Sequence, residues 1–344
     1  MLANVTCEWE SWINEPEPNP GLGPDTPPKR KWWKWVVIVA AAVIVFIGIV
    51  FFLKEKNSIP SRFNVQPKDI YAYYQKSVVL ISSMYTYEVT YNGEPLSQYL
   101  KGGYDGFDNV YLDEYQDIHS GYTGVAGTGF FITEKGHILT NRHVVCPDSE
   151  DEEMLKDKIR QILLNNKLTQ LAEGFKIKFK NLGISIAYNG VHLNDYRDMK
   201  PCTIYKLSDN EKVDLAMIQL NDKVTPYEAN YVDINKMSGN KDLSLGSELY
   251  SIGFPYTTVI GKTDFGIEAN NQKGTVTQER DEYVYGNDVN ALPGASGSPV
   301  FDSKGRLCGI MVSGFVLSQG YNHAILPDVI GEFVSNNLKT VNIK

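Results

Sequence analysis

Cysteine is scarce in this chain, with four residues among 344. Cys7 precedes a long apolar run, and the other three are Cys146, Cys202 and Cys308. Three cysteines cannot all pair with one another, and their spacing does not define a connectivity. We therefore expect one disulfide or none, which excludes a fold held together by a disulfide framework.

Basic charge is also in deficit, because 33 lysines and arginines face 41 acidic residues, a formal net charge of −8. Nucleic acid is therefore not an expected partner, since phosphate binding needs clustered cations. The five histidines form no group with metal-ligand spacing, and the sequence has no glycine-rich phosphate loop. We expect neither a metal site nor a cofactor.

Long hydrophobic runs are rare as well, and the exception is residues 35–53, nineteen consecutive uncharged and mainly apolar residues. At ~1.5 Å per residue this length crosses a hydrocarbon core, so we predict a transmembrane helix. A cleavable signal peptide is the alternative, but no small-residue cleavage site follows before Lys54. More cations precede the run than follow it, which favours a cytoplasmic N-terminus. We expect a single-pass membrane protein whose main domain is periplasmic or extracellular.

The rest of the chain divides by composition. Residues 1–34 are rich in proline and poor in apolar side chains, which predicts a disordered cytoplasmic tail. We assign residues 54–76 to a juxtamembrane linker and residues 77–344 to one domain. Short apolar runs recur on both sides of about residue 225, a pattern typical of two antiparallel β-barrels.

Three short sequence motifs in this domain carry side chains suited to nucleophilic chemistry. They are Thr-Asn-Arg-His at 140–143, Asp-Leu-Ala-Met-Ile at 214–218 and Pro-Gly-Ala-Ser-Gly-Ser-Pro at 293–299. A serine hydroxyl needs a base to take its proton and N–H groups to hold a developing oxyanion. Ser296 is therefore the candidate nucleophile, His143 the candidate base and Asp214 the partner of that base. Taken alone, each is more often an ordinary turn or surface residue.

In the chain order His143, Asp214, Ser296, these motifs resemble those of the trypsin-like (chymotrypsin-clan) serine proteases, in particular the HtrA-like bacterial branch. The resemblance covers roughly residues 77–335 and implies an all-β fold of two six-stranded antiparallel barrels with helical and loop insertions. It implies a membrane-anchored serine endopeptidase that cleaves extracytoplasmic proteins through an acyl-enzyme on Ser296, with an oxyanion hole from Gly294 and Ser296. The alternatives are a catalytically silent protease-fold module that binds peptides and an esterase.

The resemblance also assigns a pocket for the substrate side chain, lined by Asn290, Met311, Val312, Ser313 and His323. Trypsin-type preference for Lys or Arg would need an aspartate where Asn290 stands. The preference of glutamyl endopeptidases would need a histidine where Met311 stands. Neither charged pocket is supported, which favours a small or medium apolar side chain in protein or peptide substrates. Homo-oligomerisation stays open.

Two insertions and a closing helix complete the expected domain. Residues 92–122 are rich in Gly, Tyr and Asp and lie where the family has a variable loop. Residues 149–174 have apolar residues at helical spacing, so we expect one amphipathic helix that packs on the N-terminal barrel. We hypothesise that this helix screens the cleft. A helix at 328–338 should close the domain, and too few residues follow it for the PDZ domain that HtrA-type enzymes usually carry.

Overall fold

The computed structural model describes residues 65–96, 99, 123–146, 149–255, 262–263, 266–312 and 322–338. These residues all belong to one compact unit, Ser58–Lys344. The cytoplasmic tail and the transmembrane helix that we predict at 1–34 and 35–53 lie outside them, as does most of the 92–122 insertion. Across the described ranges, no helix is both long and apolar enough to span a membrane.

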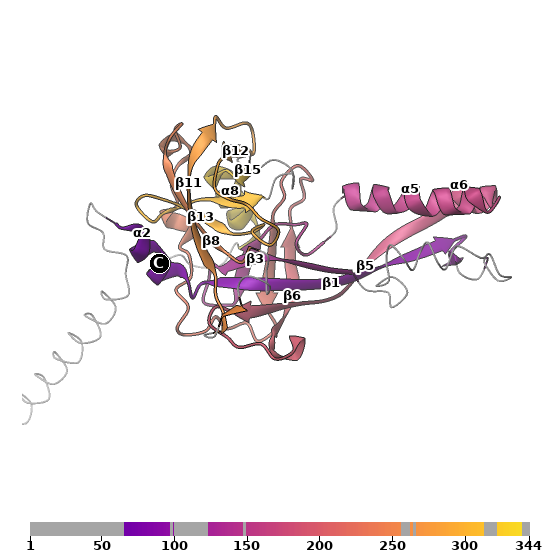
Figure 1. Ribbon diagram of the computed structural model, residues 1–344, viewed down its shortest axis with the longest axis horizontal. Helices are drawn as coiled ribbons and strands as arrows, with labels where there is room; N and C mark the ends of the chain where they lie inside the picture. Colours follow the sequence, from indigo (N-terminus) through magenta and orange to yellow (C-terminus); the bar gives the residue numbers. More distant parts are fainter. Residues whose placement is uncertain are drawn as a thin grey trace, which may run out of the picture. The chain divides into compact units, whose positions relative to one another are not determined.

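Six strands close into a barrel in the first half of the described chain (Figure 1). In pairing order they are β1 (Val78–Tyr91), β3 (Thr123–Phe131), β4 (His137–Thr140), β7 (Ala216–Leu220), β6 (Lys200–Leu207) and β5 (Phe175–Tyr188). Pairing of β1 with β5 closes the barrel, and the short strand β2 (Glu94–Pro95) pairs with the end of β1. Side chains alternate along β1, so that Val79 and Ile81 enter one hydrophobic cluster while Val78 and Leu80 enter another.

The second half of the chain forms another closed barrel. In pairing order its strands are β8 (Glu248–Gly253), β11 (Asn270–Gln278), β12 (Val284–Asn287), β15 (Asn322–Ile325), β14 (Leu307–Val312) and β13 (Pro299–Asp302). The connection from β8 to β11 holds a two-stranded sheet of β9 (Lys262–Thr263) and β10 (Gly266–Ile267). The 3-10 helices η3 (Ile234–Lys236) and η4 (Asn240–Asp242) lie between the two barrels in the chain, and η2 (Tyr196–Asp198) lies between β5 and β6 of the first. The predicted all-β architecture of two six-stranded barrels is confirmed.

One hydrophobic cluster joins the two barrels, with Phe130 from β3 and Ile252 from β8 among its buried members. The helix α8 (Pro327–Asn337) packs on the same cluster and occupies the place predicted for the closing helix. Because this cluster is continuous, the two barrels share one core at their junction.

The second part of the predicted linker at 54–76 is a helix, α2 (Pro67–Tyr74), that belongs to the domain. Its buried residues, Ile70 and Tyr74, lie four positions apart and enter the cluster that joins the barrels. The ring of Tyr74 stacks on Phe301, with 4.3 Å between centroids. The spacing of these two residues is too short a pattern to distinguish a helix from a linker in the sequence alone.

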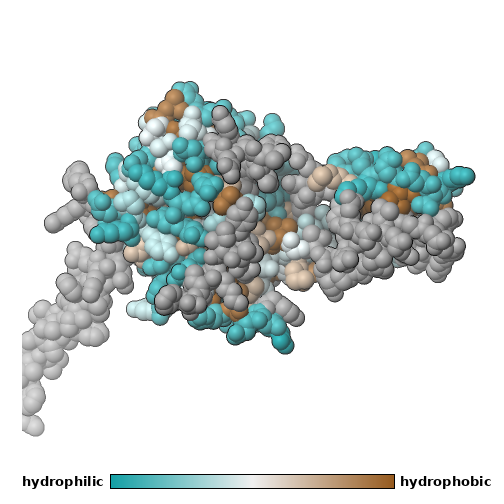
Figure 2. All heavy atoms as spheres, in the orientation of Figure 1, coloured by the Kyte–Doolittle hydropathy of each residue, from teal (hydrophilic) through white to brown (hydrophobic). Residues whose placement is uncertain are grey.

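The 149–174 segment forms two helices, α5 (Ser149–Asn165) and α6 (Thr169–Gly174), instead of one. Between them Lys167 has a φ of 62°, which interrupts the right-handed helix. Their buried residues pack against the distal ends of β1 and β5 in a separate cluster (Figure 1). The expected packing on the barrel itself is therefore replaced by packing on the ribbon that these two strands form. The exposed side of the helices is mainly hydrophilic (Figure 2), although Met154 is 57% exposed.

Candidate active site

Two hydrogen bonds join His143 to Asp214. The backbone N–H of His143 donates to Oδ1 of Asp214 at 3.0 Å, and the imidazole Nδ1 lies 2.6 Å from Oδ2. Because an ionised carboxylate only accepts hydrogen bonds, Nδ1 carries the proton of this contact and Nε2 is the basic nitrogen of the neutral ring. The two side chains are 27% and 28% exposed, so the pair is partly accessible to solvent.

The two residues meet because β4 and β7 are neighbours in the first barrel. Thr140 at the end of β4 pairs with Ala216 at the start of β7, so the flanking residues leave the sheet at the same edge. The side-chain amide of Asn141 donates to the backbone oxygen of Asp214 at 2.9 Å. This bond holds the segment that carries His143 against the segment that carries Asp214.

Ser296 lies in a tight turn ahead of β13 and is buried. Within the turn, the N–H of Ala295 donates to the oxygen of Leu292 at 2.8 Å, and that of Gly297 donates to the oxygen of Met311 at 2.9 Å. Gly297 has a φ of +85°, a conformation that side chains with a β-carbon rarely adopt. The glycines that flank the serine in the sequence are thus required by the shape of the turn.

The turn is seated against β3 of the first barrel. The N–H of Thr128 donates to the oxygen of Ser296 at 2.8 Å. A β-carbon placed on Gly127 would lie 2.6 Å from Cγ2 of Val144 and 3.2 Å from the oxygen of Ser296. Ser296 and the residue that follows His143 therefore flank the same glycine. The structure brings all three candidate residues to one place at the junction of the barrels.

The predicted oxyanion donors are the backbone N–H groups of Gly294 and Ser296. Gly294 is buried in the turn with a φ of +94°. Within the described part of the chain, its N–H donates to no acceptor, although its neighbours in the turn are hydrogen bonded. A buried N–H in this state can bind a substrate oxygen.

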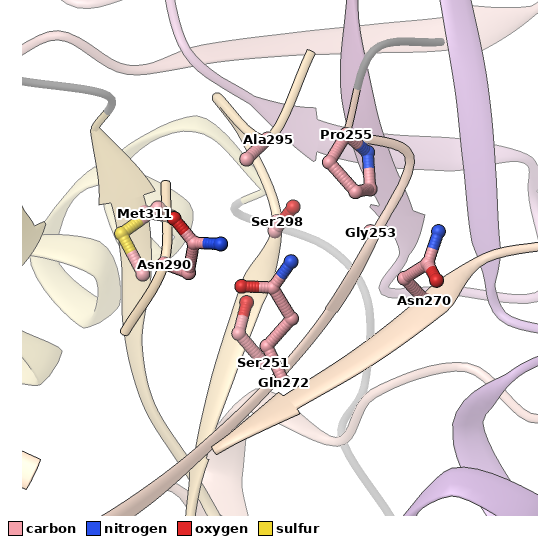
Figure 3. A pocket seen from close by; sticks show the side chains of 9 residues that line it. All are labelled: Ser251, Gly253, Pro255, Asn270, Gln272, Asn290, Ala295, Ser298 and Met311. Atoms are coloured by element: carbon pink, nitrogen blue, oxygen red, sulfur yellow. The ribbon is translucent and has the colours of Figure 1, made fainter. Parts of the chain in front are cut away.

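A small cavity lies beside the turn, between residues of β8, β11 and β14 (Figure 3). Its lining is Ser251, Gly253, Pro255, Asn270, Gln272, Asn290, Ala295, Ser298 and Met311. The cavity has room for about one water molecule. Two buried polar atoms there, Oγ of Ser298 and Oε1 of Gln272, have no hydrogen-bond partner among the described residues. The lining therefore combines polar and apolar groups and carries no formal charge.

Two of the residues predicted for the substrate pocket, Asn290 and Met311, line this cavity. Asn290 is exposed and Met311 is buried. A third, Ser313, lies outside the described residues.

The other two predicted pocket residues lie side by side at the end of the β14–β15 pair, where Val312 is opposite His323. Val312 packs on the cluster that joins the barrels, whereas His323 is exposed. The pKa of Asp281 is lowered, mainly by a hydrogen bond from the backbone N–H of Val284 and also by His323. His323 thus has a carboxylate close by on the surface, and neither residue of this pair lines the cavity in Figure 3.

Sequence reasoning missed the polar residues that β8 and β11 contribute to the cavity. Ser251 and Gln272 are directly opposite each other in the register of these strands. The available signal was the alternation in β8, where Tyr250 and Ile252 face the joining cluster and Ser251 faces the other way. The partner strand is set by long-range pairing, which the alternation does not reveal.

The histidine, cysteine and acidic side chains outside this site form no second cluster among the described residues. Within the described ranges, no group of three His, Cys, Asp or Glu residues is placed to hold a metal ion. Cys146, Cys202 and Cys308 are free thiols. Burial raises the pKa of Cys202 to about 12 and raises that of Cys308 further. Their thiols are therefore protonated at neutral pH and are poor nucleophiles.

Comparison with known families and curated proteins adds to this geometry. Residues 127–310 match the family described as "Trypsin-like peptidase domain". The chain is similar to a "Probable periplasmic serine endoprotease DegP-like" of Halomonas elongata, with 27% identity over 205 residues, which is 59% of this chain and 32% of the relative. A protein of Pseudomonas putida strain GB-1 with the same description is 26% identical over 223 residues, 62% of this chain and 35% of the relative. The chain thus spans about a third of the length of these relatives.

A "Glutamyl endopeptidase" of Staphylococcus epidermidis is similar over a larger share, with 26% identity over 250 residues, 71% of each chain. Among solved structures, the serine endoprotease from Yersinia pestis aligns with a TM-score of 0.46 and 16% identity, covering 81% of this chain and 68% of that one.

Proposed function

Because the chain belongs to the trypsin-like peptidase family, we propose that it is a serine endopeptidase that hydrolyses peptide bonds through an acyl-enzyme on Ser296. The observation that carries this proposal is the pair of hydrogen bonds that hold His143 on Asp214, beside the turn of Ser296. A histidine held in this tautomer by a carboxylate is suited to act as a base for a nearby hydroxyl.

The proposed reaction has two halves. In the first, Oγ of Ser296 bonds to the substrate carbonyl carbon while Nε2 of His143 takes the hydroxyl proton. The proton then passes to the departing amine, and the C–N bond breaks to leave an ester on Ser296. In the second half water attacks this ester, His143 takes a proton from the water, and the acid product leaves as Oγ regains a proton.

Asp214 and the turn have supporting roles in this proposal. Asp214 holds the proton-bearing Nδ1 at 2.6 Å and stabilises the imidazolium that forms in each half of the reaction. The N–H groups of Gly294 and Ser296 bind the oxyanion, since buried donors interact strongly with a charge that develops away from water.

For specificity we propose a small or medium apolar side chain before the scissile bond. Support comes from Asn290 and Met311, which occupy the positions where charged-side-chain specificities would need an aspartate or a histidine. The cavity beside the turn, which both residues line, has no charged side chain in its lining. A peptide library that varies this position would test the preference, and a dominant Lys, Arg or Glu would contradict it.

We further propose that residues 35–53 anchor the protein in a membrane and that the peptidase domain acts on proteins in the periplasm or outside the cell. The support is the length of the apolar run and the cations before it. The description of the DegP-like relatives as periplasmic agrees with this location. Added protease should digest a domain outside the cell in intact cells, and a periplasmic domain only after the outer membrane is permeabilised. A domain that stays protected until the cells are lysed would contradict both locations.

Activity itself is tested with a fluorophosphonate probe on the full-length protein purified in detergent. The wild type should be labelled, and labelling should disappear in the Ser296→Ala and His143→Ala variants. Ser303→Ala, which changes an exposed serine in the turn between β13 and β14, is the matched control and should be labelled as the wild type is. A folded wild type that binds peptides without being labelled would identify the protein as a silent protease-fold module instead.

A further inference from the structure

Thr128, near the end of β3, makes four hydrogen bonds at the junction between the barrels. Its N–H donates to the oxygen of Ser296 at 2.8 Å, and its Oγ1 donates to the oxygen of Gly294 at 2.8 Å. Its Oγ1 also accepts the N–H of Phe254 at 2.9 Å, and its own oxygen accepts Oγ1 of Thr140 at 2.7 Å. Thr128 is fully buried, with 0% exposure. One residue of the first barrel is thus hydrogen-bonded to the turn of Ser296 at two points, the backbone oxygens of Gly294 and Ser296.

The direction of these side-chain bonds is unambiguous. The backbone N–H of Phe254 can only donate and the backbone oxygen of Gly294 can only accept, so the hydroxyl proton of Thr128 is committed to Gly294. A hydroxyl at this position satisfies both groups at once. A valine has the same shape but would leave both buried backbone groups unpaired.

The oxygen that this hydroxyl holds belongs to the peptide group between Gly294 and Ala295. The other end of that group, the N–H of Ala295, donates to Leu292 at 2.8 Å. The peptide group after Ser296 is held in the same way, by Thr128 at its oxygen and by Met311 at its N–H, that of Gly297. Gly294 has no β-carbon to restrict its backbone, so the orientation of the turn depends on these external bonds.

We propose that Thr128 is a positioning residue for the oxyanion hole. Its hydroxyl holds the Gly294–Ala295 peptide group so that the N–H groups of Gly294 and Ser296 stay directed at one oxygen of the substrate. Because Phe254 follows β8, the same hydroxyl also ties the second barrel to the first, which carries His143. This inference rests on the proposed function of Ser296, but the geometry that it invokes does not.

The test uses Thr128→Val, its conservative partner Thr128→Ser and a matched control. The control is Thr225→Val, because Oγ1 of Thr225 also donates to a backbone oxygen, that of Thr133 at 2.6 Å, and accepts a backbone N–H, that of Gly136 at 3.0 Å. Thr225 is buried as well, and its bonds lie at the turn between β3 and β4, away from Ser296. The two valine variants therefore lose equivalent pairs of bonds.

With the full-length protein in detergent, both valine variants should unfold at a similarly lower temperature. Only Thr128→Val should also slow acylation by the fluorophosphonate probe, by about 10- to 100-fold, since loss of one oxyanion donor costs roughly 10²–10³ and here the donors are only misaligned. For a peptide substrate the loss should be in kcat with KM little changed. Thr128→Ser should restore the rate to within about threefold of the wild type.

Hydrogen exchange of the backbone around residues 291–298 provides a readout that needs no activity. Exchange there should rise in Thr128→Val and stay at the wild-type level in Thr225→Val and Thr128→Ser. If the wild type is not acylated but the turn loosens in Thr128→Val alone, positioning stands and the proposed function fails. If the wild type is acylated and Thr128→Val matches Thr225→Val in rate, or if exchange of the turn is unchanged, the role of Thr128 is overturned.

Discussion

Gly297→Ala should both destabilise the protein and abolish the reactivity of Ser296. A β-carbon at Gly297 would lie 2.0 Å from the oxygen of Thr128 and 2.4 Å from Oγ1 of Thr140, and the φ of +85° is itself unfavourable. Left-handed geometry costs a residue with a β-carbon roughly 1–2 kcal/mol, and overpacking in a closed site adds roughly 1–3 kcal/mol. We expect a loss of about 2–5 kcal/mol in the free energy of unfolding.

Gly246→Ala is the matched control for this prediction. Gly246 has a φ of +81°, and a β-carbon there would meet no heavy atom within 4 Å. It should lose only the conformational part, roughly 1–2 kcal/mol. The difference between the two variants therefore isolates the collision with β3 and β4.

Unfolding in urea is best followed by far-UV circular dichroism, because the barrels themselves contain no tryptophan: all five lie within residues 1–35. Fluorophosphonate labelling of the same samples should be lost in Gly297→Ala and kept in Gly246→Ala. Equal losses of stability, or normal labelling of Gly297→Ala, would show that the turn does not depend on its close approach to the first barrel.

Three further predictions concern other parts of the site and the core. Asp214→Asn should slow acylation by roughly 10³–10⁴-fold with little change in stability, as measured by probe kinetics and urea titration. The amide oxygen of the new asparagine can still accept the backbone N–H of His143, but its NH₂ group cannot accept the proton on Nδ1. Burial lowers the pKa of His137 below its ordinary 6.5. The unfolded chain therefore binds more protons near this pH, and the free energy of unfolding should fall as pH drops through about 6.5, with a smaller pH dependence in His137→Gln. Mass-spectrometric mapping of iodoacetamide adducts on the native protein should find Cys146, which is half-buried, modified well before Cys308, and equal rates would contradict the burial of Cys308.

The architecture and the identity of the candidate residues could be predicted largely from the sequence. Short apolar runs indicate strands such as β1, whose first four residues are all buried. The motifs around His143, Asp214 and Ser296 indicate the type of chemistry, since a base, a carboxylate and a serine between glycines are recognisable without coordinates. Local pattern was sufficient wherever the structure depends on neighbours in the chain.

Other features depend on neighbours that are distant in the chain. The helix α2 was assigned to a linker, because what holds it is the contact of Tyr74 with Phe301, more than two hundred positions away. The segment 149–174 was correctly predicted as helical, but its packing surface is the ribbon of β1 and β5, whose length follows from strand pairing. The polar part of the cavity lining arises from the register that places Gln272 opposite Ser251.

The sequence by itself thus determined which groups this protein has for chemistry and in which class of fold they are presented. Only the tertiary structure decided how they are held. In the sequence Thr128 is an ordinary strand residue. Once the two barrels pack together, its Oγ1 lies 2.8 Å from the oxygen of Gly294 and its N lies 2.8 Å from the oxygen of Ser296. The physical reason is that side-chain type and local periodicity are properties of short segments, whereas hydrogen bonds across a domain junction exist only once both barrels have closed and packed on a common core.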